Sequence, residues 1–523
     1  MAQFSKKAAK SFSHLQSRRA TACLPKQLTR CNTLAGLTVS SNASHLRKHN
    51  FSTLSLNNLP KNVLECEYAV RGAVVQRAQE LEAELAKGGL DFDKIVPCNI
   101  GNPQAVGQKP VVFHRQVLAC LTEPSLASHK DLFPEDVRER ASKYLAGIGD
   151  SGAGAYSHSK GHAVFRRDVA EYFTERDGFE TDIEDLFLTD GASPACKMVL
   201  QLAVRSPKDG VLLPIPQYPL YTASMSLLGG QSVGYFLDEE GGWSIQLEEL
   251  ERAVKEFRAT GGTLRAIVVI NPGNPTGQVL SRETIENVLK FAERENLMVL
   301  ADEVYQDNIH ADGKEFVSFR KVAREIGTTV EVFSFHSVSK GVVGECGLRG
   351  GLVHCENVAA DVKNEMYKLA SVNLCSNVLG QGLMASVLRH PPADGPSRAF
   401  YDKQRGETRA AMKRKAKLVT ERLNAIEGIE CQPIEGAMYA FPKITIKGYV
   451  MKKAISFATP ADQIYCLEMV NRTGVVTVPG SGFGQRPGHF HLRMTILPDE
   501  DTLNGCLDRI ETFHNQHANG WFK

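Results

Sequence analysis

A lysine at the end of an apolar run is the residue of this sequence best placed to do chemistry. The β-prone run at 332–335 gives way abruptly to Ser337, Ser339 and Lys340, and Gly341 follows as a turn residue. In open α/β sheets, ligands bind in the crevice at the carboxyl ends of the strands. The position of Lys340 therefore predicts a lysine amine that faces a ligand crevice.

Four other chemically capable residues stand near the ends of similar apolar runs. Asn274 lies within AsnProGlyAsnProThrGly, Asp302 and Tyr305 within AlaAspGluValTyr, and Arg349 within GlyLeuArgGlyGly. The runs at 266–270, 297–301, 332–335 and 350–354 read as buried strands, with a helix at 283–295 after the first. We therefore expect these side chains to gather at one edge of a sheet.

The order and wording of these motifs resemble the fold-type-I pyridoxal-phosphate (PLP) aminotransferases, and most closely the alanine aminotransferases. The resemblance is carried by residues 217–221, 271–278, 300–308, 339–347 and 478–485, and it extends from about Leu64 to the C-terminus. It implies an α/β fold: a large domain with a mostly parallel central sheet flanked by helices, and a smaller α+β domain built from the N- and C-terminal parts.

A chain of 523 residues is long enough for two or more domains. The predicted division is an N-terminal helix and part of the small domain at 65–110, a large PLP-binding domain at 111–395, and a small C-terminal domain at 396–523. Helices are expected over 65–87 and 163–176 and in the stretch 398–426, and a strand over 95–100.

Residues 1–50 have the composition of a transit peptide. They hold nine Lys and Arg and no acidic residue, whereas the remainder has 52 basic and 59 acidic residues. On a helical wheel Phe4, Ala8, Phe12 and Leu15 share one face, as in an import signal. The sequence predicts import into the mitochondrial matrix, with plastid import or a cytosolic protein as alternatives.

Composition argues against several other classes of function. The net charge of +2 gives no basic surface for nucleic acid, and no apolar run reaches the roughly 20 residues that span a bilayer. The twelve cysteines include no CysXxxXxxCys pair, so we expect reduced thiols and no metal site.

The resemblance implies a role for each residue of the predicted catalytic group. Lys340 would form the Schiff base with the PLP aldehyde and, once freed, act as the base that moves a proton. Asp302 would pair with the pyridine nitrogen and favour its protonated form. Tyr305 and Asn274 would hydrogen-bond the phenolic oxygen of the ring.

The resemblance also implies a phosphate site. Arg349 would bind the phosphate bidentately, and Ser337 and Ser339 would add hydroxyl donors. Ala192 and Ser193 follow a strand and a glycine turn at 186–191, where the start of a helix offers backbone N–H groups to an anion. We expect the Asp190 carboxylate to point away from the phosphate.

The remaining assignments concern the ring, the substrate and a second subunit. Tyr218 would stack on the pyridine face, Arg493 would clamp the substrate α-carboxylate together with Asn274, and Gly101 would lie under the substrate. Tyr156 would reach the cofactor phosphate of the neighbouring subunit, so a homodimer with active sites near its interface is expected.

The implied reaction is a ping-pong transamination, in which L-alanine and 2-oxoglutarate give pyruvate and L-glutamate. A glutamate–glyoxylate aminotransferase of the same subgroup remains an alternative, although the C-terminus lacks a peroxisomal SerLysLeu-type signal. A PLP lyase of the same fold is the other alternative. A PLP-binding transcriptional regulator is disfavoured, because the N-terminal segment has no helix-turn-helix periodicity.

Overall fold

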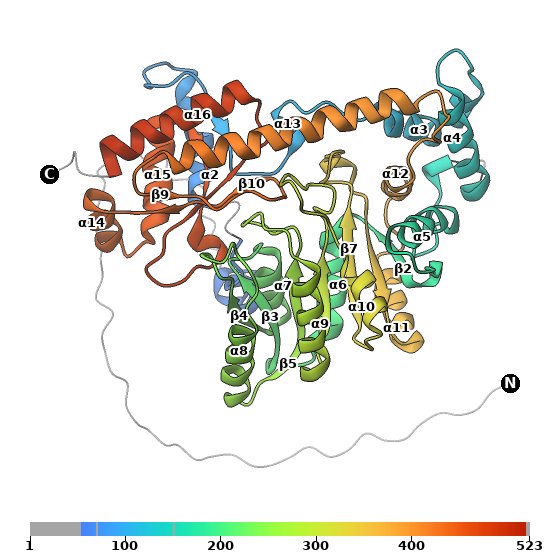
Figure 1. Ribbon diagram of the computed structural model, residues 1–523, viewed down its shortest axis with the longest axis horizontal. Coiled ribbons are helices and arrows are strands. Elements are labelled where there is room, and N and C mark those ends of the chain that lie inside the picture. The colour runs from blue at the N-terminus through green and yellow to red at the C-terminus, as the bar shows by residue number, and fades with distance from the viewer. Residues whose placement is uncertain (1–53, 69–71, 150–151, 519–523) are drawn as a thin grey trace, which may run out of the picture. The chain divides into compact units, whose positions relative to one another are not determined.

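The computed structural model describes residues 54–68, 72–149 and 152–518 (Figure 1). The predicted leader at 1–50 lies outside the described residues. Residues 54–58 belong to a separate N-terminal unit and contain one 3-10 turn, Leu56–Asn58. From Leu59 onward the chain forms one compact unit.

A seven-stranded sheet lies at the centre of the chain and confirms the predicted fold class. Its spatial order is β2-β8-β7-β6-β5-β3-β4. All neighbouring pairs are parallel except those made by β8, which runs antiparallel to both β2 and β7. The strands are β2 (Leu186–Thr189), β3 (Asp209–Ile215), β4 (Gln231–Phe236), β5 (Thr263–Ile270), β6 (Met298–Asp302), β7 (Val332–Ser337) and β8 (Gly351–Glu356).

The strands are apolar on both faces because each face is covered by helices. Along β5, Ile267 and Val269 pack into one core cluster, whereas Ala266, Val268 and Ile270 pack into another. This alternation is the period of two that a strand imposes on its side chains. A run of five apolar residues is therefore the expected sequence of a strand buried between two layers.

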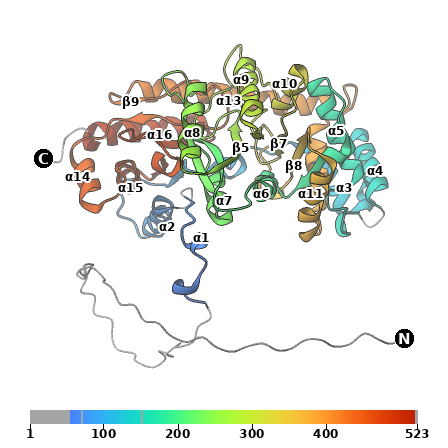
Figure 2. The same cartoon turned by 90° about the horizontal axis from the view of Figure 1, so that it is seen from below.

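Figure 2 shows the two helix layers on opposite sides of the sheet. One layer packs with Ile267 and the other with Val268, as the two core clusters require. The first contains α8 (Leu247–Ala259), α9 (Arg282–Glu295) and α10 (Phe319–Ile326); the second contains α6 (Ala192–Ala203), α7 (Leu220–Leu228) and α11 (Ala360–Val372).

A further core forms beside β2 and holds the helices that precede and follow the sheet strands. Leu186 and Leu188 of β2 and Tyr401 are buried in it. Its helices are α3 (Val112–Thr122), α4 (Glu135–Ile148), α5 (Ala163–Asp177) and α12 (Val378–Leu388).

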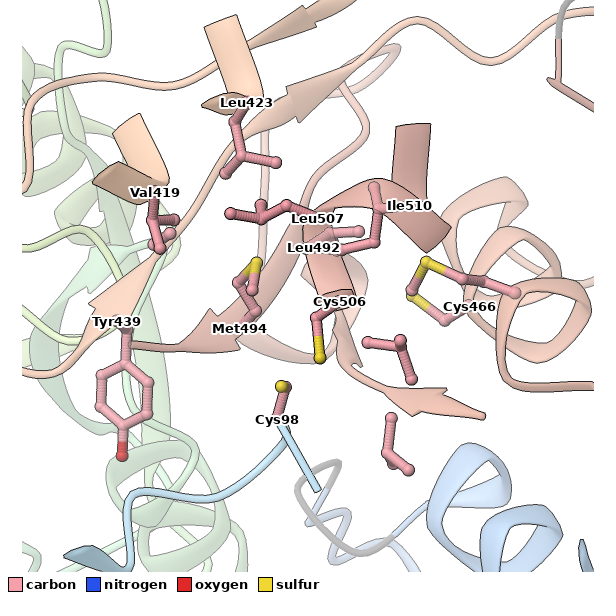
Figure 3. Close-up of a cluster of buried hydrophobic side chains, with 14 of the residues drawn as sticks. Cys98, Val419, Leu423, Tyr439, Cys466, Leu492, Met494, Cys506, Leu507 and Ile510 are labelled. Carbon is pink, nitrogen blue, oxygen red and sulfur yellow. The ribbon is translucent and has the colours of Figure 1, made fainter. Parts of the chain in front are cut away.

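A separate core joins the N-terminal residues to the C-terminal third of the chain. Cys98 packs there with residues from α13 (Arg398–Asn424) and from the C-terminal helices (Figure 3). The helix α13 begins beside α3 and α4 and ends over this core (Figure 1). The other elements are α2 (Ala73–Leu85), α14 (Gly448–Phe457), α15 (Ala461–Thr473), α16 (Glu500–Phe513), β1 (Val96–Pro97), β9 (Ile429–Glu430), β10 (Tyr439–Ala440), β11 (Lys443–Ile444), β12 (Val475–Val476), β13 (Val478–Pro479) and β14 (Leu492–Thr495).

The helix predicted over 65–87 was placed too early. Helix α2 begins at Ala73 with Gly72 at its N-cap, and only the four-residue α1 (Lys61–Leu64) precedes it. Cys66, just after α1, instead contacts α7 through its Sγ, which donates to Ala223 O at 3.7 Å. Asn62 within α1 contacts the same helix, since its Nδ2 donates to Leu227 O at 2.5 Å. Tertiary contacts thus override the helical propensity of this segment.

The strand predicted over 95–100 is shorter than expected. Only β1, Val96–Pro97, is a strand, and it pairs in parallel with β12. In the described part of the chain, no helix combines the length and the apolar character that crossing a bilayer requires.

Candidate active site

The site lies along one edge of the central sheet. Ile270 of β5 pairs with Asp302 of β6, and Asp302 pairs with Phe335 of β7. Thr189 at the end of β2 and Ser337 at the end of β7 both pair with Gly351, the first residue of β8. Because β8 runs in the opposite direction, its start lies at the same edge as the ends of the parallel strands. The loops that carry the predicted site residues therefore meet there, as the rule for open α/β sheets requires.

These loops surround a cavity of about 400 Å³. Twelve of the thirteen predicted site residues line it: Gly101, Ala192, Ser193, Tyr218, Asn274, Asp302, Tyr305, Ser337, Ser339, Lys340, Arg349 and Arg493. The exception is Tyr156, whose side chain is 79% exposed and lies outside this cavity. Within one chain, Tyr156 has no contact with the site.

Lys340 extends from the turn after β7 into the cavity. Its Nζ donates a hydrogen bond to Gly101 O at 3.2 Å and lies 5.6 Å from the centre of the Tyr305 ring. The turn depends on Gly341, which has a positive φ of 67° and whose backbone N–H donates to Asn308 Oδ1 at 2.8 Å. A left-handed residue directly after the lysine is a role for which glycine is the natural choice.

Asp302 ends β6 and is a buried carboxyl group without a salt-bridge partner within hydrogen-bonding distance among the described residues. Tyr221 Oη donates to Asp302 Oδ2 at 2.8 Å, and Val304 N donates to Oδ1 at 3.4 Å. Burial raises the pKa of Asp302, against the opposing effects of these two hydrogen bonds and of the Lys340 charge. A buried acid of this kind has the chemistry to hold a cationic ring nitrogen.

Arg349 and Gly191 form a cradle at the start of α6. Arg349 Nη2 donates to Asp190 O at 3.0 Å, and Nη1 donates to Ser339 Oγ at 3.3 Å and to Cys346 O at 3.1 Å. Arg349 itself has a positive φ of 54°, a strained conformation for a non-glycine residue. A Cβ on Gly191 would lie 2.2 Å from Arg349 Nη2, so this close approach requires glycine.

The cradle presents donors rather than acceptors to the cavity. Ala192 and Ser193 begin α6, where the backbone N–H groups have no partner within the helix. The Asp190 carboxylate accepts hydrogen bonds from Asn377 N at 2.8 Å and from Asn377 Nδ2 at 2.7 Å. It is thus engaged with Asn377, and the cradle suits a phosphate dianion.

Arg493 is a buried guanidinium with capacity left for an anion. Its Nη1 donates to Asn274 Oδ1 at 3.1 Å and its Nη2 to Asn99 O at 2.6 Å, both neutral oxygens. The Nε has no hydrogen-bond partner within the described residues. The group lies between the rings of Tyr439 and Phe483, 4.1 and 4.7 Å from their centres. A buried charge of this kind favours a carboxylate ligand.

The donor set fits pyridoxal phosphate. The buried hydroxyl of Tyr305 makes no hydrogen bond within the described residues, so it is available to a ring oxygen. The amine of Lys340, the acid of Asp302 and the cation of Arg349 lie on the wall of the same cavity, matching an aldehyde, a ring nitrogen and a phosphate.

Four residues of the site were not predicted from the sequence: Tyr68, Tyr221, Cys346 and Tyr439. Tyr68, Cys346 and Tyr439 line the cavity, and Tyr221 holds Asp302 from behind. Tyr221 follows Tyr218 by three residues and lies at the start of a helix. This spacing in the sequence could have indicated that the Tyr221 side chain points towards the sheet. Tyr439 belongs to the two-residue strand β10, whose neighbours are set by distant parts of the chain.

Comparisons with known proteins agree with this geometry. The family model "Aminotransferase class I and II" matches residues 120–510. The chain is 46% identical to alanine aminotransferase 2 of Panicum miliaceum, over 88% of this chain and 98% of that relative. It is also 46% identical to the mitochondrial alanine aminotransferase 2 of Arabidopsis thaliana, over 88% of this chain and 87% of that relative.

A solved structure extends the likeness to the fold. The alanine aminotransferase of Pyrococcus furiosus is 26% identical and has a TM-score of 0.71, covering 88% of this chain and all of that one. Sequence, fold and site geometry therefore agree that the chain belongs to the class I and II aminotransferases, a family of enzymes that work with pyridoxal phosphate.

Proposed function

We propose that this enzyme transfers the amino group of L-alanine to 2-oxoglutarate, giving pyruvate and L-glutamate in two half-reactions. The observation that carries the proposal is the meeting of Lys340, Asp302 and Arg493 on one cavity of about 400 Å³. The names of the relatives from Panicum and Arabidopsis support L-alanine as a substrate.

Lys340 is the residue that moves protons. Pyridoxal phosphate, when bound, supplies an electron sink for the negative charge at the substrate α-carbon. The Lys340 amine would hold the aldehyde carbon of the cofactor, and as a free amine it would lie beside the reacting atoms. Its reach to Gly101 O shows where the free amine is held. Because the base is already in place, the proton transfer needs little motion.

Asp302, Asn274, Tyr305 and Tyr218 orient the ring and set its charge. Asp302 would hold a proton on the ring nitrogen, since a buried carboxylate is stabilised by a cation at its open side. The free Tyr305 hydroxyl and Asn274 would bind the ring oxygen. Tyr218 would stack on the ring, held by a hydrogen bond of 2.8 Å between its hydroxyl and that of Tyr68.

Arg349, Ser337, Ser339 and the start of α6 at Ala192 and Ser193 would hold the phosphate, and Arg493 the substrate α-carboxylate. Asn274 supports Arg493 from one side at 3.1 Å. Gly101 lies next to the Lys340 amine and would form the floor beneath the substrate, as the absence of a Cβ allows.

The direct test uses the protein loaded with pyridoxal phosphate and L-alanine alone. We expect the absorbance band of the aldehyde form to be replaced by that of the amine form, with one pyruvate released per site, and 2-oxoglutarate to restore the first band. Lys340→Ala should show neither change. A lyase would leave the aldehyde band in place, because L-alanine has no β leaving group to eliminate. A glyoxylate-linked enzyme would be restored faster by glyoxylate than by 2-oxoglutarate.

The proposal includes the predicted division into domains, with the small domain made from 65–110 and 396–523. Its support is the shared core in which Val74, Leu81 and Cys98 pack against residues of α13, α15 and α16.

We further propose a homodimer in which Tyr156 completes the partner's phosphate site. Tyr156 is 79% exposed, and Val372 at the end of α11 and Leu374 just beyond it are 82% and 56% exposed. The segment is held against α11, since His158 stacks on Tyr367 with ring centres 5.0 Å apart. Apolar side chains at such exposure on a fixed segment are typical of an interface.

A mixing experiment tests the contribution across the interface. Tyr156→Ala and Lys340→Ala are each expected to have little activity. In a mixed dimer, however, one site combines an intact Lys340 with the partner subunit's intact Tyr156. Refolding an equal mixture should therefore restore activity. If each chain used its own Tyr156, mixing would restore nothing.

Finally, we propose that the chain is imported into mitochondria and acts in the matrix. The Arabidopsis relative is named mitochondrial, and residues 1–50 carry nine basic and no acidic residues. Uptake of the labelled full-length chain by isolated mitochondria, lost on removal of residues 1–50, tests the proposal.

A further inference from the structure

Asn308 ends the stretch 300–308, and the reaction described above gives it no task. Asp302 and Tyr305 of the same stretch line the cavity, whereas Asn308 does not. Its side chain is buried, with 3% of the residue exposed. Because a buried amide group needs hydrogen-bond partners, the partners of Asn308 indicate what it does.

The side chain of Asn308 holds the turn that follows Lys340. Its Oδ1 accepts a hydrogen bond of 2.8 Å from the backbone N–H of Gly341, which is itself buried. A buried N–H without a partner would be costly, so this bond fixes the place of the turn. The contact is close, because a Cβ on Gly341 would lie 3.2 Å from Asp307 Cβ. The turn therefore lies directly against residues 307 and 308.

Asn308 is in turn fixed from two directions. Its backbone N–H donates to Tyr305 O at 2.7 Å, and its carbonyl oxygen accepts from Ala437 N at 3.0 Å. A Cβ on Gly436 would lie 2.6 Å from Asn308 O, so this approach requires glycine. The first contact lies in the loop after β6 and the others in the turn before β10. The oxygen that Asn308 offers to Gly341 is thus fixed relative to Tyr305.

The amine of Lys340 depends on this turn for its direction. A lysine amine stands on a flexible stem of four carbons. Among the described residues, the Nζ of Lys340 donates only to Gly101 O, at 3.2 Å. The place of the amine is therefore set largely by the backbone of residues 340 and 341. The reacting atoms tolerate little error, since a misplacement of about 1 Å can cost about 100-fold in rate.

We propose that Asn308 is a positioning residue that, through its bond to Gly341, holds the Lys340 amine at the carbon it must reach. With pyridoxal phosphate bound, this carbon is that of the aldehyde, and amine and aldehyde join with loss of one water molecule. Asn308 takes no part in that step, but it restricts the amine beforehand. This inference rests on the proposed function, because it assumes that Lys340 binds the cofactor.

Two forms of the cofactor separate this task from a general effect on the cavity. Pyridoxal phosphate has the aldehyde that joins Lys340, whereas pyridoxamine phosphate has an amine instead and binds without joining it. In the cofactor-free full-length chain, Asn308→Ala should lower the affinity for pyridoxal phosphate about tenfold, as expected for one lost hydrogen bond, and change the Kd for pyridoxamine phosphate less than about twofold. Fluorescence titration measures both affinities, and borohydride reduction with peptide mass spectrometry measures the bond to Lys340.

Two further variants complete the test. Asn308→Asp keeps an oxygen at the position of Oδ1, so it should bind both cofactor forms as the wild type does. Asn424→Ala is the matched control, because Asn424 Oδ1 accepts a bond of the same 2.8 Å from Cys431 N and neither residue lines the cavity. This variant should also bind both forms normally.

The two cofactor forms also decide how a negative result is understood. Retained binding of pyridoxamine phosphate shows that a variant is folded around an intact cavity. The proposal is overturned if Asn308→Ala weakens both forms equally or weakens neither, or if Asn308→Asp behaves like Asn308→Ala. A wild-type chain in which Lys340 gains no pyridoxal phosphate would refute the proposed function instead.

Discussion

Replacing Gly191 by alanine should damage the phosphate cradle in two measurable ways. Gly191 has a φ of 86° and a ψ of 171°, a backbone region essentially restricted to glycine that costs another residue about 1–3 kcal/mol. The cofactor-free protein should lose that much unfolding free energy. The new Cβ would also lie 2.2 Å from Arg349 Nη2, so the guanidinium must leave the place where Asp190 O and Ser339 Oγ now hold it.

The displaced arginine sets the size of the effect on binding. A hydrogen bond to a charged group contributes about 1.5–3 kcal/mol, which corresponds to a Kd for pyridoxal phosphate raised by about 10- to 150-fold. The assay is titration of the cofactor-free protein with pyridoxal phosphate, followed by absorbance. Gly347→Ala is the matched control, because a Cβ at Gly347, in the same loop as Arg349, meets nothing within 4 Å. If Gly191→Ala and Gly347→Ala bind the cofactor equally well, Arg349 does not hold the phosphate.

Three further changes probe the ring, the floor of the site and the acid stability of the fold. Asp302→Asn keeps a partner for Tyr221 but removes the charge, so kcat should fall by about 100- to 1000-fold while the cofactor still binds; an unchanged kcat would mean that the ring nitrogen needs no carboxylate. Gly101→Ala would place a Cβ 2.2 Å from Tyr439 Oη and should lower kcat/KM at least about tenfold. The control is Gly406→Ala, at an open position in α13, which should leave activity intact and raise the melting temperature slightly. Burial lowers the pKa of His336 from 6.5 to about 4. Between these pH values the unfolded chain binds a proton that the folded chain does not bind. The unfolding free energy should therefore fall as pH drops from about 6.5 to about 4. His336→Leu should reduce this pH dependence by up to about 3 kcal/mol, measured by denaturant titration, and equal slopes in both proteins would contradict a neutral buried His336.

The sheet was predictable because its strands are buried on both faces. The runs at 266–270, 297–301, 332–335 and 350–354 fall within β5, β6, β7 and β8 or within one residue of them, and the helix expected at 283–295 is α9. Between two helix layers, apolar residues are required at every position, and such runs stand out in a sequence. The ends of these strands then indicated where the site lies.

Segments whose structure depends on distant contacts were less predictable. Helical composition over 65–87 could not show that Cys66 contacts α7 and that the helix begins only at Ala73. Tyr439 lacked a local signal, because β10 has only two residues and its place is fixed by pairing with β14. The task of Tyr156 and the boundaries between domains stay predictions, since the first depends on a second chain.

The anchoring of residues 62–68 limits how the precursor can mature. Asn62 and Cys66 are tied to α7, and the hydroxyl of Tyr68 meets that of Tyr218 at 2.8 Å, directly on the cavity wall. If the chain is imported as proposed, a peptidase that removes its leader is expected to cut ahead of Asn62. A cut beyond Tyr68 would leave Tyr218, the residue proposed to stack on the ring, without this tether, and cofactor retention would report the error.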